Sequence, residues 1–66
     1  MTIERKNTSI FDTTDDKSAE GTSEKKPNVK DIEALLKAEN WLVYDVDVWF
    51  DSMQGFWRWD CNIIRP

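Results

Sequence analysis

The sequence predicts an α+β protein: a disordered N-terminal tail, then one short helix packed on a two-stranded antiparallel β-hairpin. Three observations predict it. Large apolar side chains are scarce over residues 1–26. Apolar residues recur at helical spacing over 28–39. Two runs rich in β-branched and aromatic residues, 41–50 and 56–64, flank a short polar turn. The expected order is therefore tail, helix, strand, strand.

The first 26 residues are expected to be a disordered tail, and 27–66 the folded mini-domain. Thr, Ser, Asp, Glu and Lys dominate the tail, so it offers too little apolar area to offset the entropy lost on ordering. One apolar pair, Ile10-Phe11, interrupts this polar sequence. We interpret it as a chance pair, because isolated exposed apolar residues are common. The alternative is a short anchor that docks on a partner or on the mini-domain.

The helix is expected over about 28–39. Asn28 is a suitable N-cap, and Asp31 is well placed in the positive field of the first turn. The apolar residues Val29, Ile32, Leu35 and Leu36 fall on one helical face. Asn40 is an acceptable residue for the left-handed position that follows a helix. Three turns are marginal alone, so the helix needs a surface to pack on.

The hairpin turn is expected at 52–55, where Gly55 can take a positive φ. A turn of this length fixes the register of the two strands. The pairs expected on the helix-facing side are Phe50 with Trp57, Val48 with Trp59, Val46 with Cys61, and Tyr44 with Ile63. This face is almost entirely apolar and should receive the helix.

The other face of the hairpin is where a binding function is expected. It should carry Trp41, Val43, Asp45, Asp47 and Trp49 on one strand, and Phe56, Arg58, Asp60, Asn62 and Ile64 on the other. Asp47 would face Asp60, a destabilising arrangement of like charges, and Trp49 would face Arg58 as a cation–π pair. We expect Trp57 and Trp59 in the core, with Trp41 and Trp49 exposed.

Three interpretations of the acidic residues remain open. The face is simply solvated, or it matches a basic partner with aromatic anchors, or it holds a hard cation such as Mg²⁺ or Ca²⁺. A sheet face supplies few converging oxygens, so the metal interpretation ranks last. The predicted partner-binding residues are Trp41, Asp45, Asp47, Trp49, Phe56, Arg58 and Asp60.

The composition argues against an enzyme and against a cofactor. The chain has no histidine, only two glycines and a single cysteine, so it lacks a neutral-pH base, a glycine-rich phosphate loop, a disulfide and zinc-ligand spacing. Cys61 is expected in the core as a small apolar residue. No apolar run is long enough to cross a membrane, and no secretory leader is visible. These features predict a cytoplasmic location.

The function expected from size, acidity and surplus aromatics is protein binding, as in the small inhibitors and adaptors that phages and mobile elements direct against host proteins. The partner would have a basic surface. A nucleic-acid mimic that fills a basic groove and a structural subunit of a larger complex are the alternatives. The net charge of −4 argues against direct nucleic-acid binding. A two-stranded sheet has open edges, so a homodimer through one edge is a further expectation.

Overall fold

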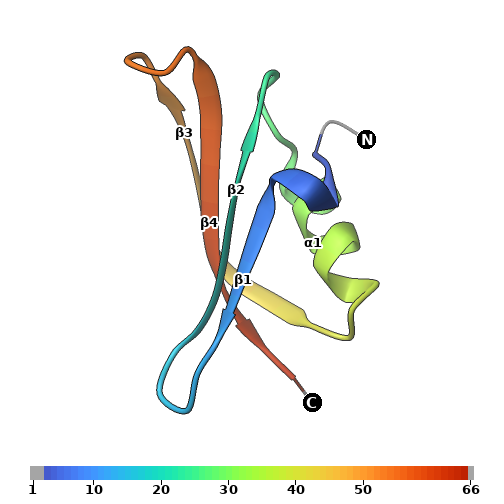
Figure 1. The fold of residues 1–66 in the computed structure, drawn as a ribbon. Coiled ribbons are helices and arrows are strands. Elements are labelled where there is room, and N and C mark those ends of the chain that lie inside the picture. The colour runs from blue at the N-terminus through green and yellow to red at the C-terminus, as the bar shows by residue number, and fades with distance from the viewer. Residues whose placement is uncertain (1–2, 66) are drawn as a thin grey trace.

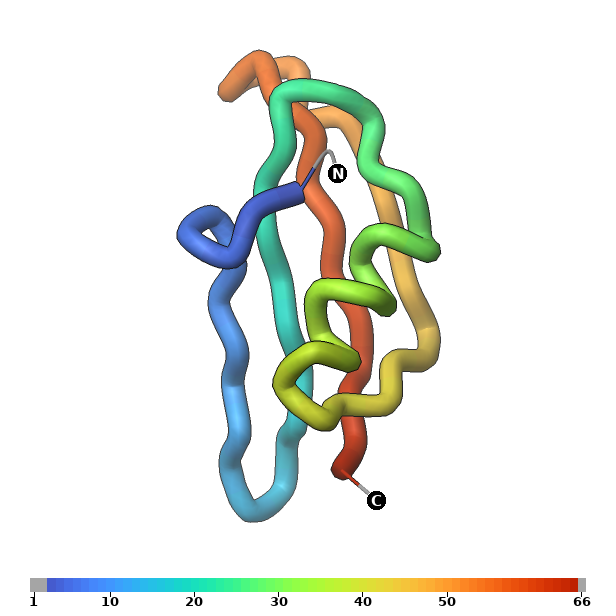
Figure 2. The backbone as a smooth tube through the Cα atoms, turned by 90° about the vertical axis from the view of Figure 1, so that its right-hand side faces the viewer, coloured from blue at the N-terminus to red at the C-terminus, as the bar shows by residue number. Residues whose placement is uncertain are grey.

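Four antiparallel strands form one sheet, and a single helix covers one of its faces (Figure 1). The computed structural model describes residues 3–65. Its elements are η1 (Arg5–Asn7), β1 (Thr8–Asp12), β2 (Lys17–Ser23), α1 (Val29–Lys37), β3 (Leu42–Asp51) and β4 (Phe56–Ile64). The strand order is β1-β2-β4-β3, and Figure 2 shows α1 in front of the sheet. The fold is mixed α and β, but the expected two-stranded hairpin is wrong.

The predicted disordered tail is the main error, because residues 8–23 form the strands β1 and β2. β2 lies in the middle of the sheet, paired with β1 on one side and with β4 on the other. Its helix-facing residues are small: Ala19, Gly21 and Ser23 lie opposite Cys61, Trp59 and Trp57. The large side chains of β4 cover this strand, so β2 is ordered without large apolar side chains of its own.

Helix α1 forms as its sequence predicts. The Asn28 side chain accepts a hydrogen bond of 2.9 Å from the Lys30 N–H, which confirms it as the N-cap. Asn40 has a φ of 67° and so takes the left-handed position expected after the helix. Ile32 and Leu36 are fully buried against the sheet.

A β-bulge in β3 changes which residues face the helix. Tyr44 lies opposite Asn62 and Asp47 lies opposite Asp60, so two residues of β3 span one of β4. Asp45, within the bulge, has a φ of 53°. The extra residue shifts the alternation of side chains along β3 by one position. Every residue of β3 before the bulge therefore lies on the opposite face from the one that strict alternation predicts.

The expected register is therefore right on one side of the bulge and wrong on the other. Phe50 pairs with Trp57 and Val48 with Trp59, as predicted. The expected pairing of Tyr44 with Ile63 is wrong, since Val43 takes that place, and Val46 falls in the interruption of the ladder. Gly55 has the predicted positive φ, at 78°.

The bulge reverses the side of the sheet on which Trp41 lies. It was expected on the exposed face, but it is 3% exposed, and the Arg65 guanidinium lies 4.0 Å from its ring centroid. The buried cluster joins residues from both halves of the chain: Ile3, Ala19, Ile32, Leu36, Trp41, Trp59, Cys61 and Ile63. Trp59 is buried as predicted, whereas Trp57 is half-buried and packs edge-on against Phe50.

Candidate functional site

The candidate site is the face of the sheet opposite α1, which we call the open face. Among residues 3–65, no helix or strand covers it (Figures 1 and 2). The strand registers place on this face Ser9 and Phe11 of β1; Ser18, Glu20 and Thr22 of β2; Leu42, Tyr44, Asp47, Trp49 and Asp51 of β3; and Phe56, Arg58, Asp60, Asn62 and Ile64 of β4. The bulge residue Asp45 joins them, because the Asn62 Nδ2 donates to its carboxylate at 3.4 Å.

Three carboxylates cross the centre of the open face in register. Glu20 lies opposite Asp60, and Asp60 lies opposite Asp47, so they form a line across β2, β4 and β3 that we call the acidic row. Directly opposite residues in an antiparallel sheet have Cβ atoms about 5 Å apart. No Lys or Arg within the described part of the chain forms an ion pair with the acidic row. The row therefore concentrates negative charge that the fold itself does not neutralise.

Arg58 lies two residues before Asp60 on β4, but its side chain forms contacts with other residues. It lies opposite Trp49, as predicted, but its Nε donates to Asp51 at 2.7 Å and its guanidinium lies 5.1 Å from the Phe56 ring centroid. The hydrogen bond from Arg58 is the main reason that the pKa of Asp51 is lowered, with the Gln54 N–H contributing next. The cation–π contact of Arg58 is thus with Phe56 on its own strand.

Exposed apolar side chains surround the acidic row. Trp49 lies on one side of it, and Phe11 and Tyr44 lie on the other, each between 43% and 50% exposed. Beyond Tyr44, the exposed residues Leu42 and Ile64 face each other across β3 and β4. Aromatic residues are enriched at protein-binding surfaces, so these half-exposed rings are candidate anchors for a partner.

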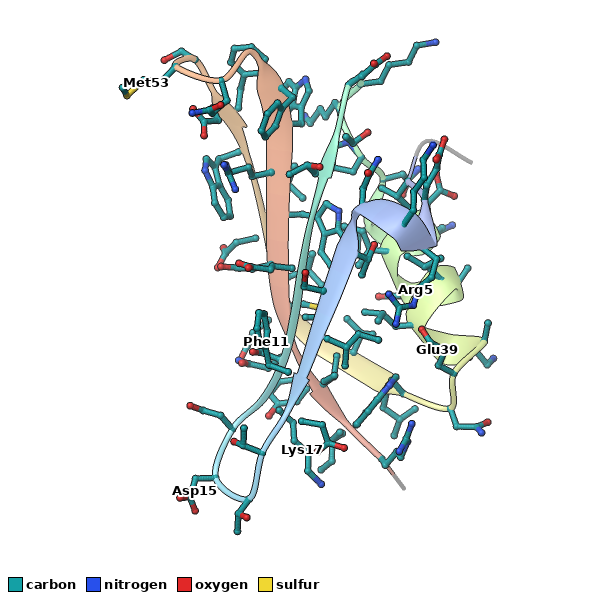
Figure 3. The ribbon with its side chains drawn as sticks, in the orientation of Figure 1. Arg5, Phe11, Asp15, Lys17, Glu39 and Met53 are labelled. Carbon is teal, nitrogen blue, oxygen red and sulfur yellow. The ribbon has the colours of Figure 1, made fainter. Side chains whose placement is uncertain are left out.

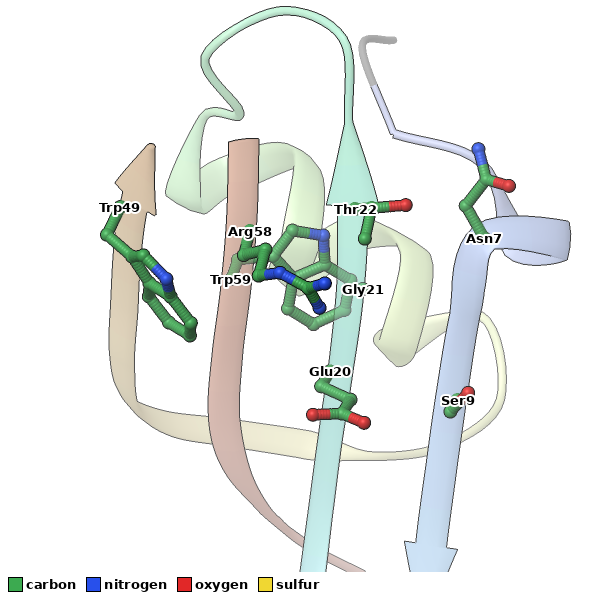
Figure 4. Close-up of a pocket in the computed structure, with 8 residues that line it drawn as sticks. All are labelled: Asn7, Ser9, Glu20, Gly21, Thr22, Trp49, Arg58 and Trp59. Carbon is green, nitrogen blue, oxygen red and sulfur yellow. The ribbon is translucent and has the colours of Figure 1, made fainter. Parts of the chain in front are cut away.

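Two shallow hollows mark the open face. One of about 210 Å³ lies among Ser9, Glu20, Thr22, Trp49 and Arg58 (Figure 4). The other, of about 320 Å³, is lined by Phe11, Ser18, Glu20, Asp45, Asp47, Asp60 and Asn62. Both are open to solvent, so they suit side chains that protrude from a partner better than a small molecule that must be enclosed.

Six of the seven predicted binding residues lie on this face: Asp45, Asp47, Trp49, Phe56, Arg58 and Asp60. The seventh, Trp41, lies in the core on the other side of the sheet. Sequence reasoning missed Glu20 and Tyr44, and it treated Phe11 as incidental. Reading 17–23 as a strand with small residues at every second position would have placed Glu20 on the polar side.

The open face presents carboxylate, aromatic, hydroxyl and amide side chains. Within residues 3–65, no three His, Cys, Asp or Glu side chains are arranged to hold a metal ion. Cys61 is buried on the helix-facing side, and burial raises the pKa of its thiol to about 11. Its thiolate, the nucleophilic form, is therefore disfavoured at neutral pH.

None of the helices in the described residues has the length and apolar character needed to cross a membrane. No known protein family matches the chain, and neither curated proteins nor solved structures show significant similarity to it.

Proposed function

We propose that this chain is a small protein-binding module whose open face docks a partner with a basic surface. It acts as an inhibitor where the covered surface is the partner's functional site, and as an adaptor where it is not. The observation that carries the proposal is the acidic row, Glu20, Asp47 and Asp60, which is aligned in register and forms no ion pair with a Lys or Arg of the described residues.

The acidic row is costly for the folded chain by itself. Like charges directly opposite on a sheet are destabilising, by up to about 1 kcal/mol for a pair. A Lys or Arg of a partner placed over the row would remove that repulsion and form charge-assisted hydrogen bonds. Relief of this repulsion would thus add to the free energy of binding.

The surrounding aromatic residues supply the contact area that charges alone do not. Trp49 and Phe56 lie toward one end of the open face, and Phe11 and Tyr44 toward the other. Large aromatic side chains dominate the energetics of protein interfaces when water is excluded from them. A partner that spans the face would cover both ends and enclose the acidic row.

The test compares two variants of equal charge. In the first, the acidic row is neutralised by Glu20→Gln, Asp47→Asn and Asp60→Asn. In the matched control, Glu4→Gln, Glu24→Gln and Glu33→Gln remove the same charge from exposed positions outside the open face. Each is titrated with a lysine-rich peptide containing two aromatic residues, at low and high salt. The proposal expects the first variant to lose binding by tenfold or more and the control to retain it.

Stability provides the second arm of the same test. The acidic-row variant should unfold at higher urea concentration than the wild type, because the repulsion is gone, while it binds the peptide less tightly. Equal peptide affinity in the two variants would overturn the proposal.

The same pair of variants then serves to capture proteins from a cell lysate. A protein that is retained by the control but lost by the acidic-row variant is the partner. Displacement of that protein by DNA would instead indicate a nucleic-acid mimic.

A further inference from the structure

We infer that two copies of this chain pair antiparallel through their β1 edges, with Phe11 opposite Phe11 of the second copy. The backbone pairing uses the edge of the sheet and involves Phe11 of the open face, and it stands whether or not the proposed function holds. The sheet ends at β1 on one side and at β3 on the other, so these are the two edges that another strand can join.

The direction of the free hydrogen-bonding groups on β1 follows from its register with β2. The two strands pair with Thr8 opposite Gly21 and Asp12 opposite Lys17. In the adjoining turn, the Thr13 N–H donates to the Asp16 carbonyl at 2.8 Å. Hydrogen-bonded and non-hydrogen-bonded pairs alternate along an antiparallel ladder. Ser9 and Phe11 are therefore bonded to β2, while Thr8, Ile10 and Asp12 direct their N–H and C=O groups outward.

Thr8 is already satisfied within its own chain. Its N–H donates to the Arg5 carbonyl, and its C=O accepts from the Arg5 Nη1 at 2.9 Å. This agrees with the outward direction derived above. The groups left for a new strand are the N–H and C=O of Ile10 and of Asp12.

Only one antiparallel register between two copies uses all of these groups. It places Ile10 opposite Asp12 of the second copy and Asp12 opposite Ile10, with Phe11 on the two-fold axis. A register centred on Ile10 would pair Asp12 with the occupied Thr8, and one centred on Asp12 would set like charges together. Phe11 is 47% exposed and points away from α1 (Figure 3). Its pairing across the axis would bury both aromatic rings.

The charges at the two ends of β1 favour the same arrangement. Arg5 and Lys6 lie at the start of the strand, in η1, where they form exposed ion pairs with Glu39 at 2.8 Å and Glu4 at 3.0 Å, whereas Asp15 and Asp16 lie in the turn after its end. An antiparallel pair brings the start of one β1 beside the end of the other. The basic end of each copy then lies near the acidic turn of its partner, and the two contacts are equivalent by symmetry.

The β3 edge lacks these features. Its bulge at Asp45 interrupts the ladder, and the strand carries the three acidic residues Asp45, Asp47 and Asp51. Bulges and charges on edge strands are ways in which proteins prevent edge-to-edge association. β1 has neither a bulge nor a proline, and its central residues are uncharged.

The test distinguishes the contribution of the outward-pointing Asp12 N–H to dimer formation from that of the Asp12 side chain. Asp12→Pro removes that N–H without touching the bonds to β2, and Asp12→Ala keeps it. Sedimentation over a concentration series should show a dimer for the wild type and for Asp12→Ala. The Asp12→Pro dimer should be weaker by on the order of tenfold or more. A monomeric wild type at every soluble concentration, or equal association of the two variants, would overturn the inference.

Disulfide trapping provides a readout that does not depend on how Asp12→Pro folds. Non-hydrogen-bonded partners have Cα atoms about 4.5 Å apart, within the range a disulfide spans. Mild oxidation should therefore link Phe11→Cys into a covalent dimer. Met53→Cys, at the fully exposed far turn, is the matched control and should stay largely monomeric. Equal linkage of the two variants would contradict the inference.

Discussion

Gly21 of β2 lies directly against the indole of Trp59 on β4. A Cβ built on Gly21 would lie 2.5 Å from Cζ2 and 2.8 Å from Nε1 of Trp59, closer than real side chains approach. Trp59 is 1% exposed, and its Nε1 has no hydrogen-bond partner in the described residues. The absence of a side chain at residue 21 is therefore what lets the Trp59 indole pack directly against the backbone of β2.

Gly21→Ala should lower the free energy of unfolding by about 1–3 kcal/mol, because the added methyl group would overlap the buried indole. Urea denaturation followed by tryptophan fluorescence measures this loss. Thr22→Ala, one residue along and half-exposed, should cost much less. In the background of Trp59→Leu, where the indole is gone, Gly21→Ala should cost little. Additive losses in that double-mutant cycle would contradict the contact.

Asp45 lies in the bulge, and its backbone has a left-handed conformation that β-branched residues avoid. Asp45→Gly should leave the free energy of unfolding unchanged or raise it, and Asp45→Val should lower it by roughly 1–2 kcal/mol. Asp47→Val is the control, because Asp47 lies in the regular ladder and valine favours strands. If valine is equally tolerated at both positions, the bulge does not impose the conformation described here.

The hydrogen bond from Arg58 holds the pKa of Asp51 below its usual value of 3.8. A carboxyl whose pKa is lower in the folded state than in the unfolded state stabilises the fold at pH values above that usual value. That contribution disappears as the pH falls from there through the folded pKa. Denaturation of the wild type across this acidic range should show the loss, and Arg58→Gln should reduce it. NMR titration should show the Asp51 pKa rising in the variant, and an unchanged value would exclude Arg58 as the cause.

Cys61 should be unreactive in the folded protein. Burial raises the pKa of its thiol to about 11, and its side chain is 3% exposed. Alkylation by iodoacetamide at pH 8 should therefore be slow in buffer and should accelerate in urea together with the fluorescence transition. The raised pKa also means that stability falls as pH rises from about 9 toward 11, because the unfolded thiol loses its proton first. Rapid alkylation without denaturant would show that the core opens locally.

The helix, the C-terminal hairpin turn and part of its register were predictable because their signals are local. Asn28, Asn40 and Gly55 act on their own neighbours, and the alternation from Val48 to Phe50 is regular. β2 was not predictable in this way, because its order depends on side chains of β4 that lie some 40 residues later in the chain. Ala19, Gly21 and Ser23 carry the signal as a run of small residues at every second position, which a search for large apolar residues overlooks.

The bulge limited the prediction of the site. Strict alternation assigns Trp41 to the same face as Trp49, and a single extra residue at 45–46 reverses that assignment. Aspartate tolerates the left-handed conformation better than most residues, but it does so at many positions that are not bulges. Beyond the bulge, Asp47, Trp49, Phe56, Arg58 and Asp60 were placed correctly on one face, because alternation there is undisturbed.

The central position of β2 has a practical consequence for anyone who prepares this protein. Residues 1–26 look dispensable, and trimming them is a routine step in designing a shorter expression clone. Here the cut would expose the β4 edge, Trp59 and Cys61 to water, and the remaining piece should aggregate or stay unfolded. Adding a synthetic peptide of residues 1–26 back should restore the fold, so the chain is a natural candidate for a split reporter that regains its structure when its two pieces meet.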